Sequence, residues 1–146
     1  QDFNSELPSV MDFVFFETLQ RMMTYEPSWD KGLVEMYNAM GMDYLYPDIN
    51  NVMIFAENHD TTRFNEKNEL LGDFKIAMTL LATTRGIPQL YYGSEIGFKG
   101  DKAKGDADLR KDMPGGWPND ERSAFDAETQ HGLSANFDSS IYNHDI

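Results

Sequence analysis

The chain of 146 residues carries 25 acidic and 12 basic side chains, for a formal net charge of −13. Such a charge repels nucleic-acid phosphates and anionic membrane surfaces, so the sequence predicts no nucleic-acid or membrane partner. Hydrophobic residues make up 40% of the chain, which is enough for one packed core. The absence of cysteine excludes disulfide bonds, thiolate metal sites and a cysteine nucleophile.

The first third of the chain predicts one strand followed by two helices. A short apolar strand is expected at residues 9–14. Apolar side chains then recur at helical spacing, which predicts a helix through Phe15, Phe16, Leu19, Met22 and Met23. A second helix is expected at residues 30–40, with Asp30 as its N-cap and Gly41 as its end.

The middle of the chain predicts a buried strand, a long helix and a third strand. Residues 52–56 form a continuous apolar run, typical of a strand covered on both faces in a parallel sheet. A long helix is expected to begin near Asn65 or Asn68 and to end at Gly86. The third strand is expected at residues 90–92.

Residues 97–125 are rich in Gly, Asp, Lys and Pro and are expected to form a long loop, whereas residues 126–146 show no pattern that assigns them. Strands that alternate with helices indicate an α/β fold with a parallel sheet. A (β/α)8 barrel takes about 250 residues, so three strands amount to a part of one. The chain also begins with Gln1 instead of Met, and residues 1–146 are therefore expected to be a single fragment of a longer protein.

A polar cluster directly follows the apolar run at residues 52–56. Ligands and catalytic groups collect at this end of parallel strands. His59 and Asp60 together offer a donor and an acceptor to neighbouring sugar hydroxyls, and Arg63 is placed to keep Asp60 ionised. The structural alternative is that Asp60 or Thr61 caps the next helix.

A second cluster lies in the expected loop. Asp106 and Arg110 are four residues apart, close enough to pair on one turn, and Trp117 offers an aromatic face for a sugar ring. The alternative is a surface ion pair of little energetic value. The acidic residues of this loop lack the spacing of a calcium loop, and the three histidines lack metal-ligand spacing, so we predict no metal and no cofactor.

Three segments resemble conserved stretches of the α-amylase superfamily, glycoside hydrolase family 13. Residues 55–60, Phe-Ala-Glu-Asn-His-Asp, are similar to the family stretch on the seventh barrel strand, and residues 86–97 resemble the eighth-strand signature. Residues 100–117 are similar to the neopullulanase, cyclomaltodextrinase and starch-utilisation amylase type. The resemblance covers roughly residues 8–125.

The resemblance implies a partial (β/α)8 TIM barrel containing about the last three units, strands six to eight. It implies that the chain is part of a retaining hydrolase of α-glucosidic bonds in starch-derived oligosaccharides or cyclodextrins. In this family the nucleophile and the general acid follow strands four and five, so this chain alone is expected to be inactive. The alternatives are a transglycosylase or isomerase of the same superfamily, and a non-catalytic carbohydrate-binding fragment.

The resemblance also implies a role for individual residues. Asp60 would be the catalytic carboxylate that stabilises the transition state and binds the 2- and 3-hydroxyls of the sugar at the cleavage point. His59 would bind the same sugar, and Asp106 and Arg110 would bind sugars toward the non-reducing side. Four residues would support the site: Asn58, Arg63, Tyr92 and Glu95. Of these, Arg63 is expected to orient Asp60.

The expected partner is an α-glucan oligosaccharide, bound by the complete enzyme. An open part of a barrel also leaves strand edges and an inner face uncovered, so we expect the fragment to self-associate. The starch-utilisation resemblance implies a periplasmic or extracellular location.

Overall fold

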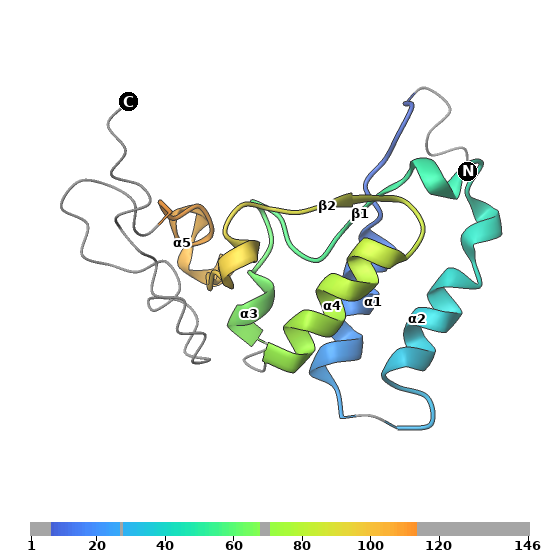
Figure 1. The fold of residues 1–146 in the computed structure, drawn as a ribbon, viewed down its shortest axis with the longest axis horizontal. Coiled ribbons are helices and arrows are strands. Elements are labelled where there is room, and N and C mark those ends of the chain that lie inside the picture. The colour runs from blue at the N-terminus through green and yellow to red at the C-terminus, as the bar shows by residue number, and fades with distance from the viewer. Residues whose placement is uncertain (1–6, 27, 68–70, 114–146) are drawn as a thin grey trace, which may run out of the picture.

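Two short parallel strands lie at the centre of the molecule (Figure 1). The computed structural model describes three stretches of the chain: residues 7–26, 28–67 and 71–113. Strand β1 (Met53–Phe55) pairs in parallel with β2 (Ile87–Gln89), and a single parallel bridge joins Met11 to Met53 on β1. The predicted parallel pairing and α/β class are therefore confirmed for this part of the chain.

The helices of the described residues differ greatly in length. The α-helices are α1 (Phe13–Thr24), α2 (Leu33–Met40), α3 (Phe64–Lys67), α4 (Leu71–Thr83) and α5 (Asp106–Leu109). The 3-10 turns are η1 (Asp43–Leu45), η2 (Ile49–Asn51), η3 (Ser94–Ile96) and η4 (Lys102–Lys104). In Figure 1, α2 lies at one side of the molecule and α5 at the opposite side, with α1 and α4 between them.

The main core lies between β1 and the helices α1 and α4. Ile54 and Ala56 are buried on the helix-facing side of β1, beside Phe15, Leu19 and Leu81. Phe55 points to the other side of the strand and is equally buried, because its ring stacks on Phe16 at a centroid distance of 5.0 Å and meets Phe13 edge-on at 5.2 Å. The prediction that this strand is covered on both faces is therefore confirmed.

The expected first strand at residues 9–14 is reduced to one bridge at Met11. Asp12 ends it, because its side chain accepts a hydrogen bond from the Phe15 backbone N–H at 2.9 Å and so caps α1. Phe13 and Val14 are consequently helical, and the prediction that they belong to a strand is wrong.

The second predicted helix begins three residues late. Asp30 is not its N-cap, since that position is taken by Gly32, whose φ of 85° suits glycine better than any other residue. Gly41 does end the helix, as predicted.

The expected long helix is two helices in the structure, α3 and α4, with residues 68–70 between them lying outside the described part. Asn65 lies inside α3 instead of capping it, and Asn68 lies outside the described residues. Gly86, at φ 95°, follows the end of α4 as expected.

The third strand also differs from the prediction, because β2 occupies residues 87–89 and not 90–92. Pro88 lies within β2, opposite Ile54. The backbone N–H groups of a strand alternate in direction, and Ile87 donates to Val52 O at 2.8 Å. Pro88, one residue on, therefore needs no donor toward β1, as is typical of proline on an edge strand.

The predicted loop from residue 97 is partly regular. Within the described residues it contains η4 and α5, each of three or four residues. No helix among the described stretches is long and apolar enough to cross a membrane.

Candidate functional site

The turn that follows β1 carries the predicted catalytic residue, and Asn58 shapes this turn. The buried Asn58 side-chain oxygen accepts a hydrogen bond from the Asp60 backbone N–H at 2.8 Å. The Asn58 backbone N–H in turn donates to the Thr61 hydroxyl oxygen at 2.9 Å. The structural alternative, in which Asp60 or Thr61 caps the next helix, is wrong, because the Glu57 carboxylate accepts from the first N–H of α3, that of Phe64, at 2.6 Å.

The structure brings His59, Asp60, Asp106 and Arg110 together, from segments about 50 residues apart in the sequence. Asp60 Oδ1 lies 2.8 Å from the Arg110 guanidinium, and Asp60 Oδ2 lies 3.1 Å from His59 Nε2. Arg110 also donates to the His59 carbonyl at 3.1 Å and pairs with Asp106 at 3.1 Å. The sequence did not identify Lys102, whose ammonium lies 2.6 Å from Asp106 and 4.0 Å from Asp60.

This cluster of His59, Asp60, Lys102, Asp106 and Arg110 is open to solvent, and we call it the sugar-site cluster because the resemblance predicts that it binds sugar. The Asp60 side chain is 57% exposed and that of His59 is 56% exposed. Exposed ion pairs are each weak, so the carboxylates and cations of the cluster can exchange these partners for the hydroxyl groups of a ligand at small cost. A hydrogen bond from Lys102, and then the charge of Arg110, hold the pKa of Asp106 below its usual range, which keeps that carboxylate an acceptor.

A buried ion pair lies beneath the sugar-site cluster. Arg63 donates to Glu57 Oε1 at 2.8 Å, and both side chains are almost fully buried, at 0% and 3% exposure. The Ser94 hydroxyl donates to the same Glu57 oxygen at 2.7 Å. The prediction that Arg63 pairs with Asp60 and keeps it ionised is therefore wrong, because its guanidinium is bound to Glu57 and to main-chain carbonyls, and the arginine on Asp60 is Arg110.

Aromatic rings enclose the Arg63 guanidinium. Its carbon lies 4.0 Å from the centroid of the Tyr91 ring, 5.2 Å from that of Tyr92 and 5.5 Å from that of Phe98. These faces attract a cation and exclude water from it. The Tyr92 carbonyl accepts from Arg63 at 2.8 Å, and the Tyr92 hydroxyl donates to the Lys111 carbonyl at 2.8 Å. Its role as a support of the site stays a prediction.

Of the remaining predicted residues, the structure describes Glu95 and not Trp117. Glu95 lies in η3 and is exposed, next to the buried Ser94. Trp117, His131 and His144 lie outside the described residues. Glu57 was not predicted as a site residue. The signal for it is an acidic side chain directly after the apolar run at residues 52–56, with Arg63 on the same polar turn. Within the described stretches, no group of three or more His, Cys, Asp or Glu side chains is arranged to hold a metal ion.

The segment that carries Asp106 and Arg110 is fastened to the turn at several points. The Arg63 backbone N–H donates to the Gly100 carbonyl at 2.8 Å, and the Lys102 backbone N–H donates to the Thr62 hydroxyl at 3.1 Å. Asp108 accepts from the Asp101 backbone N–H at 2.7 Å, and this hydrogen bond is the main cause that lowers the pKa of Asp108. These contacts give an exposed loop a defined position.

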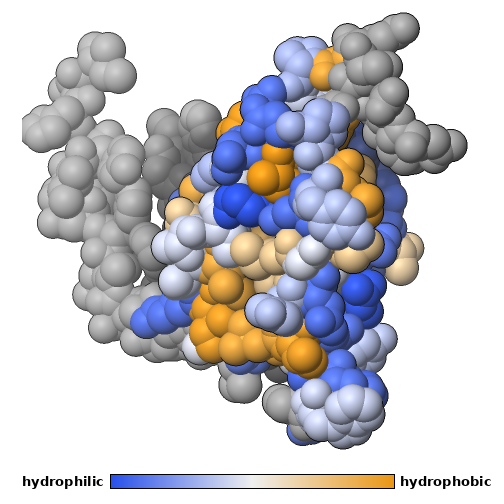
Figure 2. Space-filling model, turned by 90° about the vertical axis from the view of Figure 1, so that its right-hand side faces the viewer, coloured by the Kyte–Doolittle hydropathy of each residue, from blue (hydrophilic) through white to orange (hydrophobic). Residues whose placement is uncertain are grey.

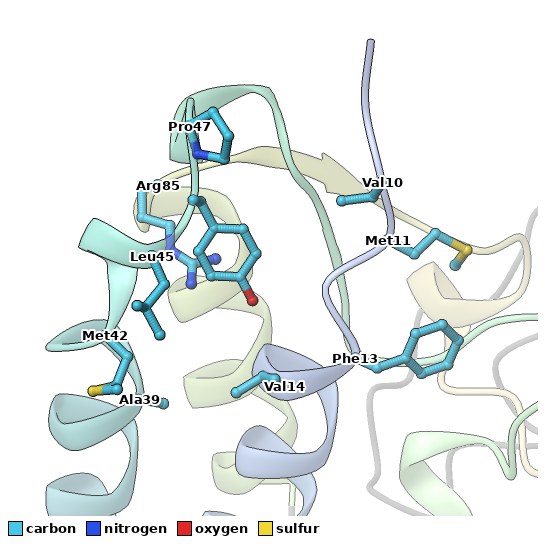
Figure 3. Close-up of a pocket in the computed structure, with 10 residues that line it drawn as sticks. Val10, Met11, Phe13, Val14, Ala39, Met42, Leu45, Pro47 and Arg85 are labelled. Carbon is cyan, nitrogen blue, oxygen red and sulfur yellow. The ribbon is translucent and has the colours of Figure 1, made fainter. Parts of the chain in front are cut away.

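A hollow of about 680 Å³ lies at the other end of the molecule, between the residues before α1 and the turn after α2 (Figure 3). Its walls are mostly apolar: Val10, Met11, Phe13, Val14, Ala39, Met42, Leu45, Tyr46, Pro47 and Arg85. Arg85 is held by Asp12 at 2.6 Å and Asp43 at 2.7 Å, so its charge is already compensated. Arg85 precedes β2 whereas Asp60 follows β1, and the hollow is therefore separate from the sugar-site cluster.

Comparison with known proteins identifies the family to which the chain is similar. The family model described as the α-amylase catalytic domain matches residues 4–142. A cyclomaltodextrin glucanotransferase of Paenibacillus macerans is 29% identical over 106 residues, which cover 73% of this chain and 14% of that protein. An α-amylase of Niallia circulans is 30% identical over 87 residues, which cover 60% of this chain and 16% of that protein.

A solved structure agrees with these relatives. The α-amylase of Geobacillus thermoleovorans in complex with acarbose superposes with a TM-score of 0.61 at 27% identity, over 72% of this chain and 24% of that one. The chain thus spans only a small part of its relatives, and it matches part of an α-amylase barrel. Since the family model matches nearly all of it, this chain belongs to the α-amylase catalytic-domain family of glycoside hydrolases.

Proposed function

We propose that the protein to which this chain belongs hydrolyses α-glucosidic bonds in starch-derived oligosaccharides or cyclodextrins, with retention of configuration. The observation that carries this proposal is the exposed Asp60 carboxylate beyond the end of β1, with His59 on one oxygen and Arg110 on the other. In this proposal the segment bridged through Met11, then β1 and β2, correspond to barrel strands six, seven and eight.

Asp60 acts in this mechanism as the stabilising carboxylate. Positive charge develops on the sugar in an oxocarbenium-like transition state, and hydrogen bonds to the sugar hydroxyls strengthen there. Asp60 accepts hydrogen bonds from the 2- and 3-hydroxyls, and His59, 3.1 Å from it, donates to the same sugar. Asp106 and Arg110 bind the next sugars toward the non-reducing end, as a carboxylate and a forked donor suit adjacent hydroxyls.

The chain alone is proposed to be inactive. A retaining glycosidase needs two carboxyl groups roughly 5–5.5 Å apart, one as nucleophile and one as general acid and base. Asp60 is proposed for neither role, and both groups are assigned to the upstream part of the catalytic domain. Binding of sugar by the chain alone is proposed to be weak, because half of the site is then absent and the remainder is not preorganised.

Release of reducing sugar from maltoheptaose tests the proposal. The full-length protein is expected to release it, and the purified 146-residue chain is expected to release none above buffer. An inactive full-length protein would reject the proposed function. Hydrolysis by the chain alone, abolished by Asp60→Ala, would instead reject the assignment of nucleophile and acid to the upstream segment.

Transfer to a second sugar is the other candidate, and one observation favours it. The relative from Paenibacillus macerans is named a glucanotransferase. Hydrolysis and transfer share the glycosyl-enzyme intermediate and differ in whether water or a sugar accepts the glycosyl group. Adding glucose as an acceptor to the same assay separates them, because transfer yields longer or cyclic products with no net gain in reducing ends, whereas each hydrolysis adds one.

Self-association of the isolated 146-residue chain is proposed because its apolar faces are open. Figure 2, viewed from the side on which α2 lies in Figure 1, shows a large hydrophobic area among polar ones. Several large hydrophobic side chains are exposed: Phe13, Val14, Leu33, Tyr37, Leu45 and Leu90. Light scattering coupled to size exclusion should give a mass of two chains or more, whereas a monomer at high concentration would contradict this.

A further inference from the structure

We propose that Arg63 is a positioning residue, which places Arg110 and, through Arg110, the carboxylate of Asp60. The expected effect of Arg63 on catalysis rests on the proposed function, whereas its positioning of Arg110 does not. The Arg63 guanidinium donates to Glu57, Tyr92 and Leu109 and not to Asp60. We therefore infer that its effect on sugar binding is transmitted through the segment that carries Arg110.

The first step is the anchoring of Arg63 at the ends of both strands. One guanidinium nitrogen donates to Glu57, which follows β1, and to the Tyr92 carbonyl, which follows β2, each at 2.8 Å. The Arg63 side chain is fully buried. Its counter-charge, the Glu57 carboxylate, also accepts a hydrogen bond from the Ser94 hydroxyl. The guanidinium is thus fixed relative to the sheet.

The second step is the attachment of the 100–109 segment to this fixed group. The two other guanidinium nitrogens donate to the buried Leu109 carbonyl at 3.0 and 2.7 Å. The backbone N–H of the same arginine donates to the Gly100 carbonyl at 2.8 Å. Arg63 therefore holds both ends of the 100–109 segment. Arg110 is the next residue after the bound Leu109 carbonyl.

The third step is the contact of Arg110 with the turn that carries the Asp60 carboxylate. Arg110 donates to the His59 carbonyl at 3.1 Å and to Asp60 Oδ1 at 2.8 Å. His59 and Asp60 lie on the turn between Glu57 and Arg63, so the contacts form a closed ring. A shift of the Leu109 carbonyl moves the base of Arg110, and with it the donor that sets the Asp60 carboxylate.

Only arginine satisfies this arrangement. The planar guanidinium distributes its donors over one carboxylate and two carbonyls at fixed angles, while its faces lie against aromatic rings, the nearest at 4.0 Å. Lysine keeps the charge but has one nitrogen and no fork, so it cannot reach all three acceptors. Arg63→Lys therefore removes the positioning while it preserves the counter-charge for Glu57.

The test compares Arg63→Lys with Arg85→Lys in the full-length protein. Arg85 is the matched control, an arginine bound by Asp12 and Asp43 before β2, away from the sugar-site cluster. In Arg63→Lys the freed segment should be cut by trypsin after Lys102 and Lys104 about tenfold faster, as loss of a charged hydrogen bond predicts. Cleavage after Lys31 is the internal reference, and Arg85→Lys should leave the rates at Lys102 and Lys104 unchanged.

Kinetics complete the test. The KM for maltoheptaose should rise about tenfold in Arg63→Lys and stay unchanged in Arg85→Lys, even where both lower the melting temperature. Unchanged cleavage at Lys102 and Lys104 in Arg63→Lys would overturn the proposal, and so would a freed segment with unchanged KM. If the wild-type protein cleaves no maltoheptaose, the proposed function fails, and the tryptic rates alone decide whether Arg63 holds the segment.

A milder variant covers the case in which Arg63→Lys does not fold. Tyr91→Leu removes the nearest ring and leaves the hydrogen bonds of Arg63 in place. It should speed cleavage at the same two lysines about threefold, in line with the loss of one cation–π contact. No acceleration in this folded variant would equally overturn the proposal.

Discussion

Asp60→Asn is expected to lower kcat/KM of the full-length enzyme on maltoheptaose about a thousandfold. The amide retains the size of the side chain but loses the negative charge that faces the oxocarbenium-like transition state, and interactions of this kind supply several kcal/mol. Because each 1.4 kcal/mol is a factor of ten in rate, a loss of roughly 4 kcal/mol gives that figure. Steady-state kinetics on the purified variant measure it.

Asp112→Asn is the control for charge alone, since Asp112 is an exposed acid close to the sugar-site cluster in the sequence. It should change kcat/KM less than threefold, as surface substitutions do. If Asp60→Asn retains more than a tenth of the wild-type kcat/KM, Asp60 is not the stabilising carboxylate, and the assignment carried from the family fails at this position.

Glu57→Gln is expected to lower the free energy of unfolding by about 3–5 kcal/mol, the usual loss when one partner of a buried ion pair is removed. The neutral amide leaves the fully buried Arg63 without its counter-charge. It also turns one of two acceptor oxygens into a donor, facing either the Ser94 hydroxyl or the Phe64 N–H. Urea unfolding of the full-length protein measures the change.

The matched control is Glu95→Gln, the same chemical change at an exposed glutamate one residue from Ser94. It should alter stability by no more than about 0.5 kcal/mol. A Glu57→Gln protein as stable as the wild type would show that the buried pair is replaceable and that the packing around it holds the turn without it.

The sequence predicts β1 well and proposes four of the five residues of the sugar-site cluster, His59, Asp60, Asp106 and Arg110, because the evidence for both is local or chemical. An unbroken apolar run of five residues, at positions 52–56, is typical of a buried strand. The polar residues that follow it therefore lie at the end of that strand. The pairing of Asp106 and Arg110 needs only a spacing of four. Their approach to Asp60 is a long-range contact, and only the family resemblance anticipated it.

The errors have physical causes. From the sequence alone, Asp12 is compatible with the end of a strand and with a helix N-cap. In the structure its carboxylate accepts a hydrogen bond from the Phe15 backbone N–H, which makes it the N-cap of α1. Pro88 makes a strand at residues 87–89 unexpected from the sequence, but it is tolerated there because the backbone N–H that donates to Val52 belongs to Ile87. Arg63 was paired with the nearest predicted carboxylate, whereas burial favours Glu57, the acid that enters the core with it.

The contacts that complete the site are distant along the chain, and this has a consequence for folding. The Arg63 hydrogen bonds to Leu109 span 46 residues, and the Arg110 contact with Asp60 spans 50. Such contacts form only after the chain between them has lost much of its freedom. The α1–β1–α4 core also joins distant segments, since Met11 bridges Met53, but its larger cluster of buried apolar side chains offsets that entropy cost. This core can therefore be organised in the folding transition state while the sugar-site cluster is still open. Mutations at Leu109 should accordingly speed unfolding more than they slow folding.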